Sequence, residues 1–184
     1  MISPSDNHMH KVSKYSKRLI KVGVDGSYSL YEYEPSISKP LVVNFEKLRT
    51  IRRLRFLYEC LKGGYKVYYL SNGDTLVGHC VVTPGGRRLS ISTKNDIVLA
   101  PYYISPEYRG CGYAKILVRM TLMYCTYKYQ SAYDWIHDDN IASIKTSLAC
   151  GFIQEGHKLN VVGITRKLVI NDNGDNIIYR YSRI

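Results

Sequence analysis

Hydrophobic and polar positions alternate in short runs through much of the chain, and this period of two is typical of half-buried strands. The runs that face each other across a short turn are 19–24 and 28–33 around Asp25-Gly26, and 65–71 and 75–82 around Asn72-Gly73-Asp74. Because Asn-Gly and Asp-Gly accept the positive φ angles of tight turns, each pair predicts a β-hairpin.

Other stretches carry hydrophobic residues at spacings of three and four, which predicts amphipathic helices. These helices span 44–61, 112–129 and 140–149. Asn44 is the expected N-cap of the first helix, and Met123 is expected on the core-facing side of the second. The remaining predicted strands are 88–92, 97–104, 132–136 and, after an extended stretch from residue 152, 177–182.

Hairpins followed by alternating strands and helices predict an α/β fold. We expect a mixed, mostly antiparallel twisted sheet of about seven strands with helices on both faces. A length of 184 residues fits a single domain, which we place at 17–184. Residues 1–16 are polar and lack periodicity, so they predict a flexible tail.

Composition narrows the classes of function. Five cysteines without a C-x-x-C pair argue against a disulfide framework or a metal site, and they favour a cytoplasmic location. No hydrophobic run approaches the ~20 residues of a membrane span. The net charge is +11, but basic residues are spread along the chain, which argues against nucleic acid as the partner. Eighteen tyrosines leave room for a homodimer interface.

The most informative segment joins the predicted strand 97–104 to the helix that follows it. It contains a Ser-Pro turn and then Gly110 and Gly112, which let the backbone approach a ligand closely. The first N–H groups of the next helix have no partner inside it and lie at the positive end of its dipole, so they suit a phosphate. The spacing matches neither the dinucleotide fingerprint nor the P-loop.

The pattern Arg-x-x-Gly-x-Ala at Arg109, Gly112 and Ala114 resembles the coenzyme A loop of the GNAT acyltransferase superfamily. A second match lies about 30 residues downstream, where Asn140-Ile141-Ala142-Ser143 opens a segment that closes with Gly151-Phe152. The resemblance covers residues 65–165 best, and it implies the superfamily's fold.

The resemblance also implies a binding mode for acetyl-CoA, with no metal. The residues expected to hold the cofactor through backbone or side chain are Tyr102, Tyr103, Ile104, Arg109, Gly110, Cys111, Gly112, Tyr113, Ala114, Asn140 and Ser143. Strand residues would bond the pantetheine arm, and the loop amides would bind the pyrophosphate.

The catalytic positions depart from the family's usual pattern. A tyrosine commonly stands seven residues after the asparagine and protonates the leaving thiolate, but this chain has Ser147 there. A glutamate that some members carry is replaced by Ala100. We therefore expect Ser147 as a contact to the sulfur and His137 as the general base, because imidazole exchanges protons near neutral pH. A water chain without a dedicated base is the alternative.

The leading hypothesis is an acetyl-CoA-dependent N-acetyltransferase that acts on the amine of a small molecule such as an amino sugar or amino acid. A protein or peptide amine, or an aminoacyl-tRNA, is the alternative acceptor. A non-catalytic acyl-CoA-binding regulatory module is the alternative of another class, supported by the unusual residues at both catalytic positions.

Overall fold

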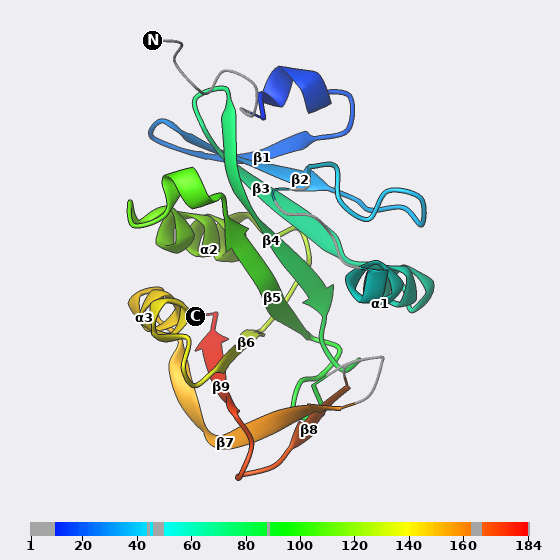
Figure 1. Ribbon diagram of the computed structural model, residues 1–184, viewed down its shortest axis with the longest axis vertical. Coiled ribbons are helices and arrows are strands. Elements are labelled where there is room, and N and C mark those ends of the chain that lie inside the picture. Colours follow the sequence, from blue (N-terminus) through cyan, green and yellow to red (C-terminus); the bar gives the residue numbers. More distant parts are fainter. Residues whose placement is uncertain (1–9, 44, 46–49, 88, 163–166, 184) are drawn as a thin grey trace.

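Nine strands form one continuous sheet in the order β1-β2-β3-β4-β5-β6-β9-β7-β8 (Figure 1). The computed structural model describes residues 10–43, 45, 50–87, 89–162 and 167–183. The strands are β1 Ile20–Asp25, β2 Tyr28–Tyr33, β3 Lys66–Asn72, β4 Thr75–Pro84, β5 Asp96–Ile104, β6 Ser131–His137, β7 Ile153–Val162, β8 Lys167–Ile170 and β9 Asn176–Ser182. The helices are α1 Thr50–Leu61, α2 Tyr113–Tyr124 and α3 Ile141–Ala149, with short 3-10 helices at Val12–Tyr15 and Pro106–Tyr108.

Both predicted hairpins are present. β1 pairs with β2, and β3 with β4, each antiparallel. Gly26 and Gly73 occupy the turns with φ angles of 57° and 56°, in the left-handed region that glycine enters without a Cβ clash. The local sequence therefore determined these four strands.

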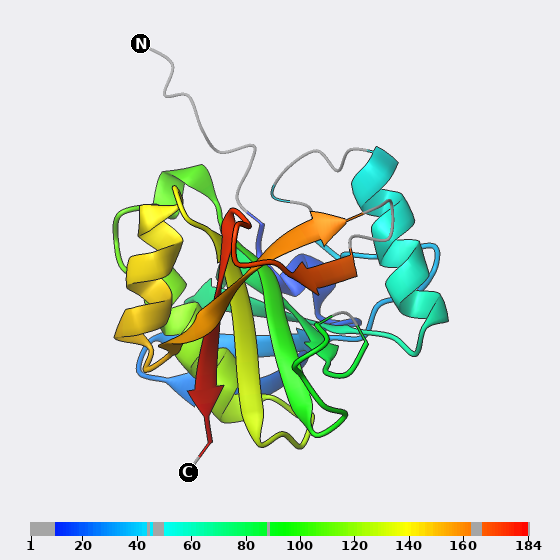
Figure 2. The same cartoon turned by 90° about the horizontal axis from the view of Figure 1, so that it is seen from below.

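The helices cover both faces of the sheet, as predicted. α2 and α3 lie on one side and α1 on the other in both views (Figures 1 and 2). Side chains of β3 alternate between the two layers: Tyr68 packs in the cluster that contains Leu117 of α2, and Tyr69 packs in the cluster that contains Phe56 of α1. The period of two in the sequence thus separates two hydrophobic cores.

β5 and β6 form a parallel pair, whereas the other neighbouring strands described above pair antiparallel, and α2 is the crossover between β5 and β6. Their ladder runs from Asp96–Ser131 to Leu99–Asp134 and ends there. On its other edge, β5 pairs with β4 through an irregularity, because Leu99 faces Val82 while Tyr102 faces Cys80. The extra residue of β5 falls at 100–101, and Pro101 has no N–H to extend a ladder.

Several predicted boundaries were wrong. The sheet has nine strands, because β8 and the long β7 were expected only as extended chain. The stretch 88–92 is a turn in its described residues, since the Ser92 hydroxyl donates to the Leu89 carbonyl and accepts from the Gly86 amide. α2 ends at Tyr124 instead of residue 129, and two residues beyond this end the Thr126 amide donates to the Tyr68 hydroxyl. Met123 is 64% exposed rather than core-facing.

The N-terminal segment forms backbone hydrogen bonds with β4 and the turn before it, where the structure describes it. Residues 1–9 lie outside the described part. The Val12 amide donates to the Asp74 carbonyl, and the Leu76 amide donates to the His10 carbonyl. From residue 10 onward this stretch therefore extends the pairing of β4, and the flexibility of the tail stays a prediction. The expected N-cap Asn44 also lies outside the described residues.

Candidate active site

The loop between β5 and α2 presents two glycines in a conformation that other residues rarely adopt. Gly110 has a φ angle of 77°, and Gly112, the N-cap of α2, has one of 79°. A Cβ added to either glycine would meet no atom within 4 Å. Both residues are exposed. The backbone at this point therefore faces open space in which a ligand can approach it.

Five successive backbone amides in this loop are free to bind such a ligand. Among the described residues, none accepts a hydrogen bond from the N–H groups of 110–114, and the first bond into the helix is from Lys115 to the Gly112 carbonyl. These amides lie at the positive end of the twelve-residue helix α2. The arrangement fits an anion such as a pyrophosphate.

Other side chains of the loop are already engaged within the protein. The Arg109 Nε donates to the Ile104 carbonyl at 3.1 Å, and its guanidinium lies 5.1 Å from the centre of the Tyr103 ring. The Tyr113 hydroxyl accepts a 2.9 Å bond from the Asn72 side-chain amide of β3. The Cys111 thiol is exposed and contacts the Arg109 carbonyl at 3.6 Å. These contacts fix the loop to the end of β5.

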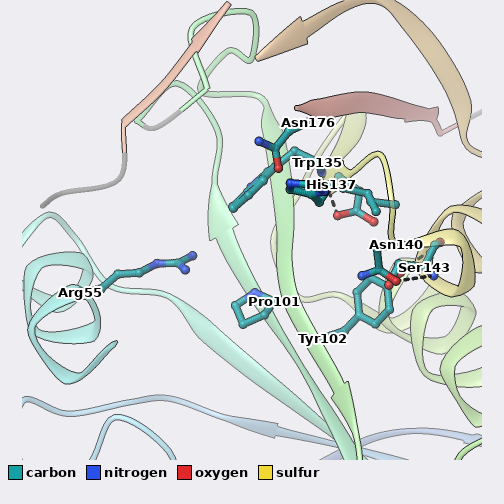
Figure 3. Close-up of a pocket in the computed structure, with 10 residues that line it drawn as sticks. Arg55, Pro101, Tyr102, Trp135, His137, Asn140, Ser143 and Asn176 are labelled. Carbon is teal, nitrogen blue, oxygen red and sulfur yellow. Dashed lines mark hydrogen bonds between the residues drawn. The ribbon is translucent and has the colours of Figure 1, made fainter. Parts of the chain in front are cut away.

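A cavity of about 340 Å³ lies where β5 and β6 cease to pair. It is lined by Arg55, Pro101, Tyr102, Asp134, Trp135, Ile136, His137, Asn140, Ser143 and Asn176. Figure 3 shows that these residues approach it from both sides of the sheet, with Arg55 on α1 and with Asn140 and Ser143 on α3. The cavity thus passes between the two strands.

The α3 side of the cavity is held together by a short chain of hydrogen bonds. Asn140 caps α3, and its Oδ1 accepts from the Ser143 amide at 3.2 Å (Figure 3). The Tyr102 hydroxyl donates to the Ser143 carbonyl at 3.3 Å. These bonds connect β5 to α3 and place three predicted cofactor residues, Tyr102, Asn140 and Ser143, on one cavity wall.

Asp134 is the buried carboxyl group of this cavity. Its side chain is 3% exposed, Oδ2 accepts from the Ser147 hydroxyl at 2.8 Å, and Oδ1 accepts from the Trp135 amide at 2.9 Å. Burial raises the pKa of Asp134 to about 7, against the opposing effect of these two hydrogen bonds. Asp134 can therefore gain or lose a proton at neutral pH.

The two predicted catalytic residues lie in different environments. Ser147 is fully buried and does not line the cavity itself; its hydroxyl is directed to Asp134. His137 lines the cavity at the end of β6, its side chain is 51% exposed, and its Nδ1 lies 2.8 Å from Asp139 Oδ1. Only His137 of the two can meet a substrate directly in this arrangement.

Sequence reasoning missed the part that Asp134 plays in the site. The signal was present, because alternation along 132–136 places Asp134 on the same buried face as Ala132 and Ile136, where a carboxylate is rare. Arg55 gave no such signal, since arginines are common on amphipathic helices.

The fold and this site define an acyltransferase, and the sequence agrees. Residues 31–152 match the model of the acetyltransferase (GNAT) family. The match covers most of the chain, and the protein belongs to this family. Among proteins with curated functions, none matches the sequence significantly.

Several solved structures share the fold at low sequence identity. A ribosomal-protein-S5-alanine acetyltransferase from Vibrio fischeri has a TM-score of 0.57 and 14% identity, over 87% of this chain and 95% of that one. A variant of the spermidine N-acetyltransferase SpeG from Vibrio cholerae has a TM-score of 0.57 and 15% identity, over 86% and 95%. The protein yncA from Salmonella typhimurium, solved with its cofactor acetyl-CoA, has a TM-score of 0.52 and 18% identity, over 76% of each chain.

In the part of the chain that the structure describes, no helix has the length and hydrophobicity needed to cross a bilayer. Within the same ranges, no group of three or more histidine, cysteine, aspartate or glutamate side chains is placed to hold a metal ion.

Proposed function

We propose that the protein transfers an acetyl group from acetyl-CoA to the amine of a small molecule such as an amino sugar or amino acid. The observation that carries this proposal is the row of five free amides at the N-terminus of α2, which lies directly after the strand that opens the cavity. When bound, acetyl-CoA supplies a thioester whose acetyl group an amine can accept.

The residues present fit this cofactor in two places. The amides of 110–114 bind the pyrophosphate, and Cys111, Tyr113 and Ala114 take part through their backbone. The edge of β5 beyond Leu99 no longer pairs with β6, so the backbone of Tyr102, Tyr103 and Ile104 can bond an extended pantetheine arm as a strand would. Asn140 and Ser143 contact the same arm from α3.

The acceptor must lose a proton, and His137 is the side chain placed to take it. It lies at the cavity wall and on the protein surface at once, so it can pass the proton on to solvent. The contact from Asp139 Oδ1 stabilises the imidazolium that results.

A small acceptor is favoured by the size of the cavity, which lies at the lower end of the range for small-molecule sites. The net charge of +11 supports the alternative of an acidic peptide or an aminoacyl-tRNA. All five cysteines are free thiols, which supports a reducing, cytoplasmic compartment.

The test combines calorimetry with turnover. We expect acetyl-CoA to bind and free thiol to be released with one amine of a panel that includes amino sugars, amino acids, polyamines and basic or acidic peptides. Binding without thiol release from any amine would favour the regulatory module. A protein that binds heparin or RNA but gives no heat with acetyl-CoA would contradict the proposal.

A further inference from the structure

We propose that Asp134 is the acid that protonates the departing thiolate, and that Ser147 is the residue that positions it. This inference rests on the function proposed above. It assigns to a carboxyl group the proton transfer that a phenol would perform if a tyrosine stood at position 147.

Asp134 accepts a hydrogen bond from α3 on the side of the helix that carries the predicted cofactor contacts. Asn140, Ser143 and Ser147 follow each other at spacings of three and four, so they share one side of the helix. A pantetheine arm that contacts the first two residues runs toward the third. Ser147 is itself buried, and the group that reaches the cavity at this point is the carboxyl it bonds, 2.8 Å away.

The acid strength of Asp134 suits the protonation of a thiolate. Alkyl thiols have pKa values of about 8.5, and a buried thiolate without a cation beside it binds a proton more tightly still. An acid with the pKa of Asp134, about 7, transfers its proton to such a thiolate downhill. A serine hydroxyl is far too weak an acid to do so, which leaves Ser147 the role of orienting the carboxyl.

The proton transfer balances. The neutral amine forms a bond to the acetyl carbonyl carbon and gives up one proton to His137. The carbon–sulfur bond breaks, and its electron pair remains on sulfur, which takes the proton from Asp134. Asp134 is left as a carboxylate that regains a proton from solvent through the open cavity, so that one proton leaves the amine and one joins the thiol.

Four other titratable groups face Asp134 in the interior of the protein. They are Cys80 from β4, Tyr102 from β5, Cys150 at the end of α3 and Tyr179 from β9. Burial raises the pKa of every one of them, that of Cys150 to about 11, so all four are neutral at pH 7. Among these five groups, a proton exchanged near pH 7 therefore belongs to Asp134.

The experiment uses the Asp134→Asn and Ser147→Ala variants of the full chain. Asp172→Asn and Thr146→Ala are the matched controls, because Asp172 is an exposed turn residue and the Thr146 hydroxyl bonds only within α3. Carbon-13 NMR of the aspartate carboxyls, without cofactor, should show one group titrating near pH 7 that Asp134→Asn removes. Ser147→Ala should move this titration to higher pH, because the hydrogen bond from Ser147 lowers the pKa of Asp134 in the wild type and the variant lacks that bond.

The kinetic readout is kcat at saturating substrates as a function of pH. In the wild type, kcat should fall on the alkaline side as Asp134 loses its proton. Asp134→Asn should lose roughly 10²–10⁴-fold in kcat and lack this alkaline limb, while its affinity for acetyl-CoA by calorimetry stays within about twofold of the wild type. Ser147→Ala should shift the limb upward in pH, which a purely structural role would not do.

The outcomes separate the two proposals. Absence of acetyl-CoA binding by the wild type overturns the proposed function and the acid role together. Binding and turnover with an Asp134→Asn variant that keeps its kcat and its alkaline limb overturns the acid role alone. If Asp134→Asn instead loses the acidic limb of the pH profile, Asp134 acts as a base, and the acid role is again overturned.

Discussion

Leu99 and Asp134 form the last pair of the parallel β5–β6 ladder, and the cavity begins at the residues that follow them. The end of pairing leaves the edge of β5 without a partner strand on this side. It also brings the Asp134 carboxyl to the cavity wall beside Tyr102. One interruption in a sheet thus supplies both a backbone edge and an ionisable group for the site.

Substitution of Gly112 tests the anion-binding loop. We expect Gly112→Glu to reduce the affinity for acetyl-CoA at least 100-fold, because the side chain would enter the open space in front of the amides with the same charge as the ligand. The positive φ angle adds strain. Calorimetry measures the affinity. Gly156→Glu on β7 is the matched control, since that exposed glycine also has open space around it but no positive φ angle.

The role of His137 can be isolated by comparison with a second histidine. His137→Gln should lower kcat/KM roughly 10²–10⁴-fold while leaving acetyl-CoA binding unchanged, because the variant lacks the side chain that removes the proton from the amine substrate. His157→Gln is the control, since His157 is equally exposed and also contacts an aspartate, Asp172, but lies on β7. If both variants were equally active, His137 would not be the base, and water would remove the proton from the amine.

The buried carboxyl should cost stability at neutral pH. The pKa of Asp134 is raised from 3.8 to about 7, so its favourable contribution is complete below pH 3.8 and is lost as pH rises through about 7. Asp134→Asn should therefore be more stable than the wild type by roughly 4 kcal/mol at pH 8, and the difference should disappear near pH 4.

Urea unfolding at both pH values measures this difference. Asp172→Asn should change little at either pH, because Asp172 is 76% exposed. If the Asp134 variant proved less stable than the wild type at pH 8, the buried carboxylate would stabilise the folded state, and the prediction would be wrong.

Glu32 gives a stability effect of the opposite sign, away from the site. Burial raises its pKa, but bonds from Lys66, Thr126 and Tyr68 outweigh this and hold the pKa below the ordinary 4.5. Lys66 Nζ lies 2.7 Å from Oε1, and the Tyr68 hydroxyl lies 2.8 Å from Oε2. Glu32→Gln should cost roughly 1–3 kcal/mol at pH 7.

This cost should shrink as pH falls through 4.5 and below, since the wild-type carboxylate then takes up a proton and loses the same interactions. Thermal unfolding at pH 7 and pH 3 measures it. Glu34→Gln, at an exposed position two residues further along the chain, should behave as the wild type.

Local sequence determined much of the fold but less of the site. Turn residues such as Gly26 and Gly73 fixed the hairpins because their φ angles are a local property. β8 escaped prediction because its pairing with β7 depends on contacts between separate segments. In the same way, Arg109, Gly112 and Asn140 were predicted as site residues from short motifs, whereas the contact between Ser147 and Asp134 joins a helix to a strand thirteen residues earlier.

Pro101 has one further consequence for how the protein meets its ligand. A proline offers no amide hydrogen, and the extra residue of β5 beside it puts the strand out of step with β4. β5 and β6 are already unpaired beyond Leu99 and Asp134, so no strand pairing has to be broken when a ligand binds. The opening between β5 and β6 is present before a ligand arrives, and the association of a ligand with the protein should therefore proceed without a slow opening step.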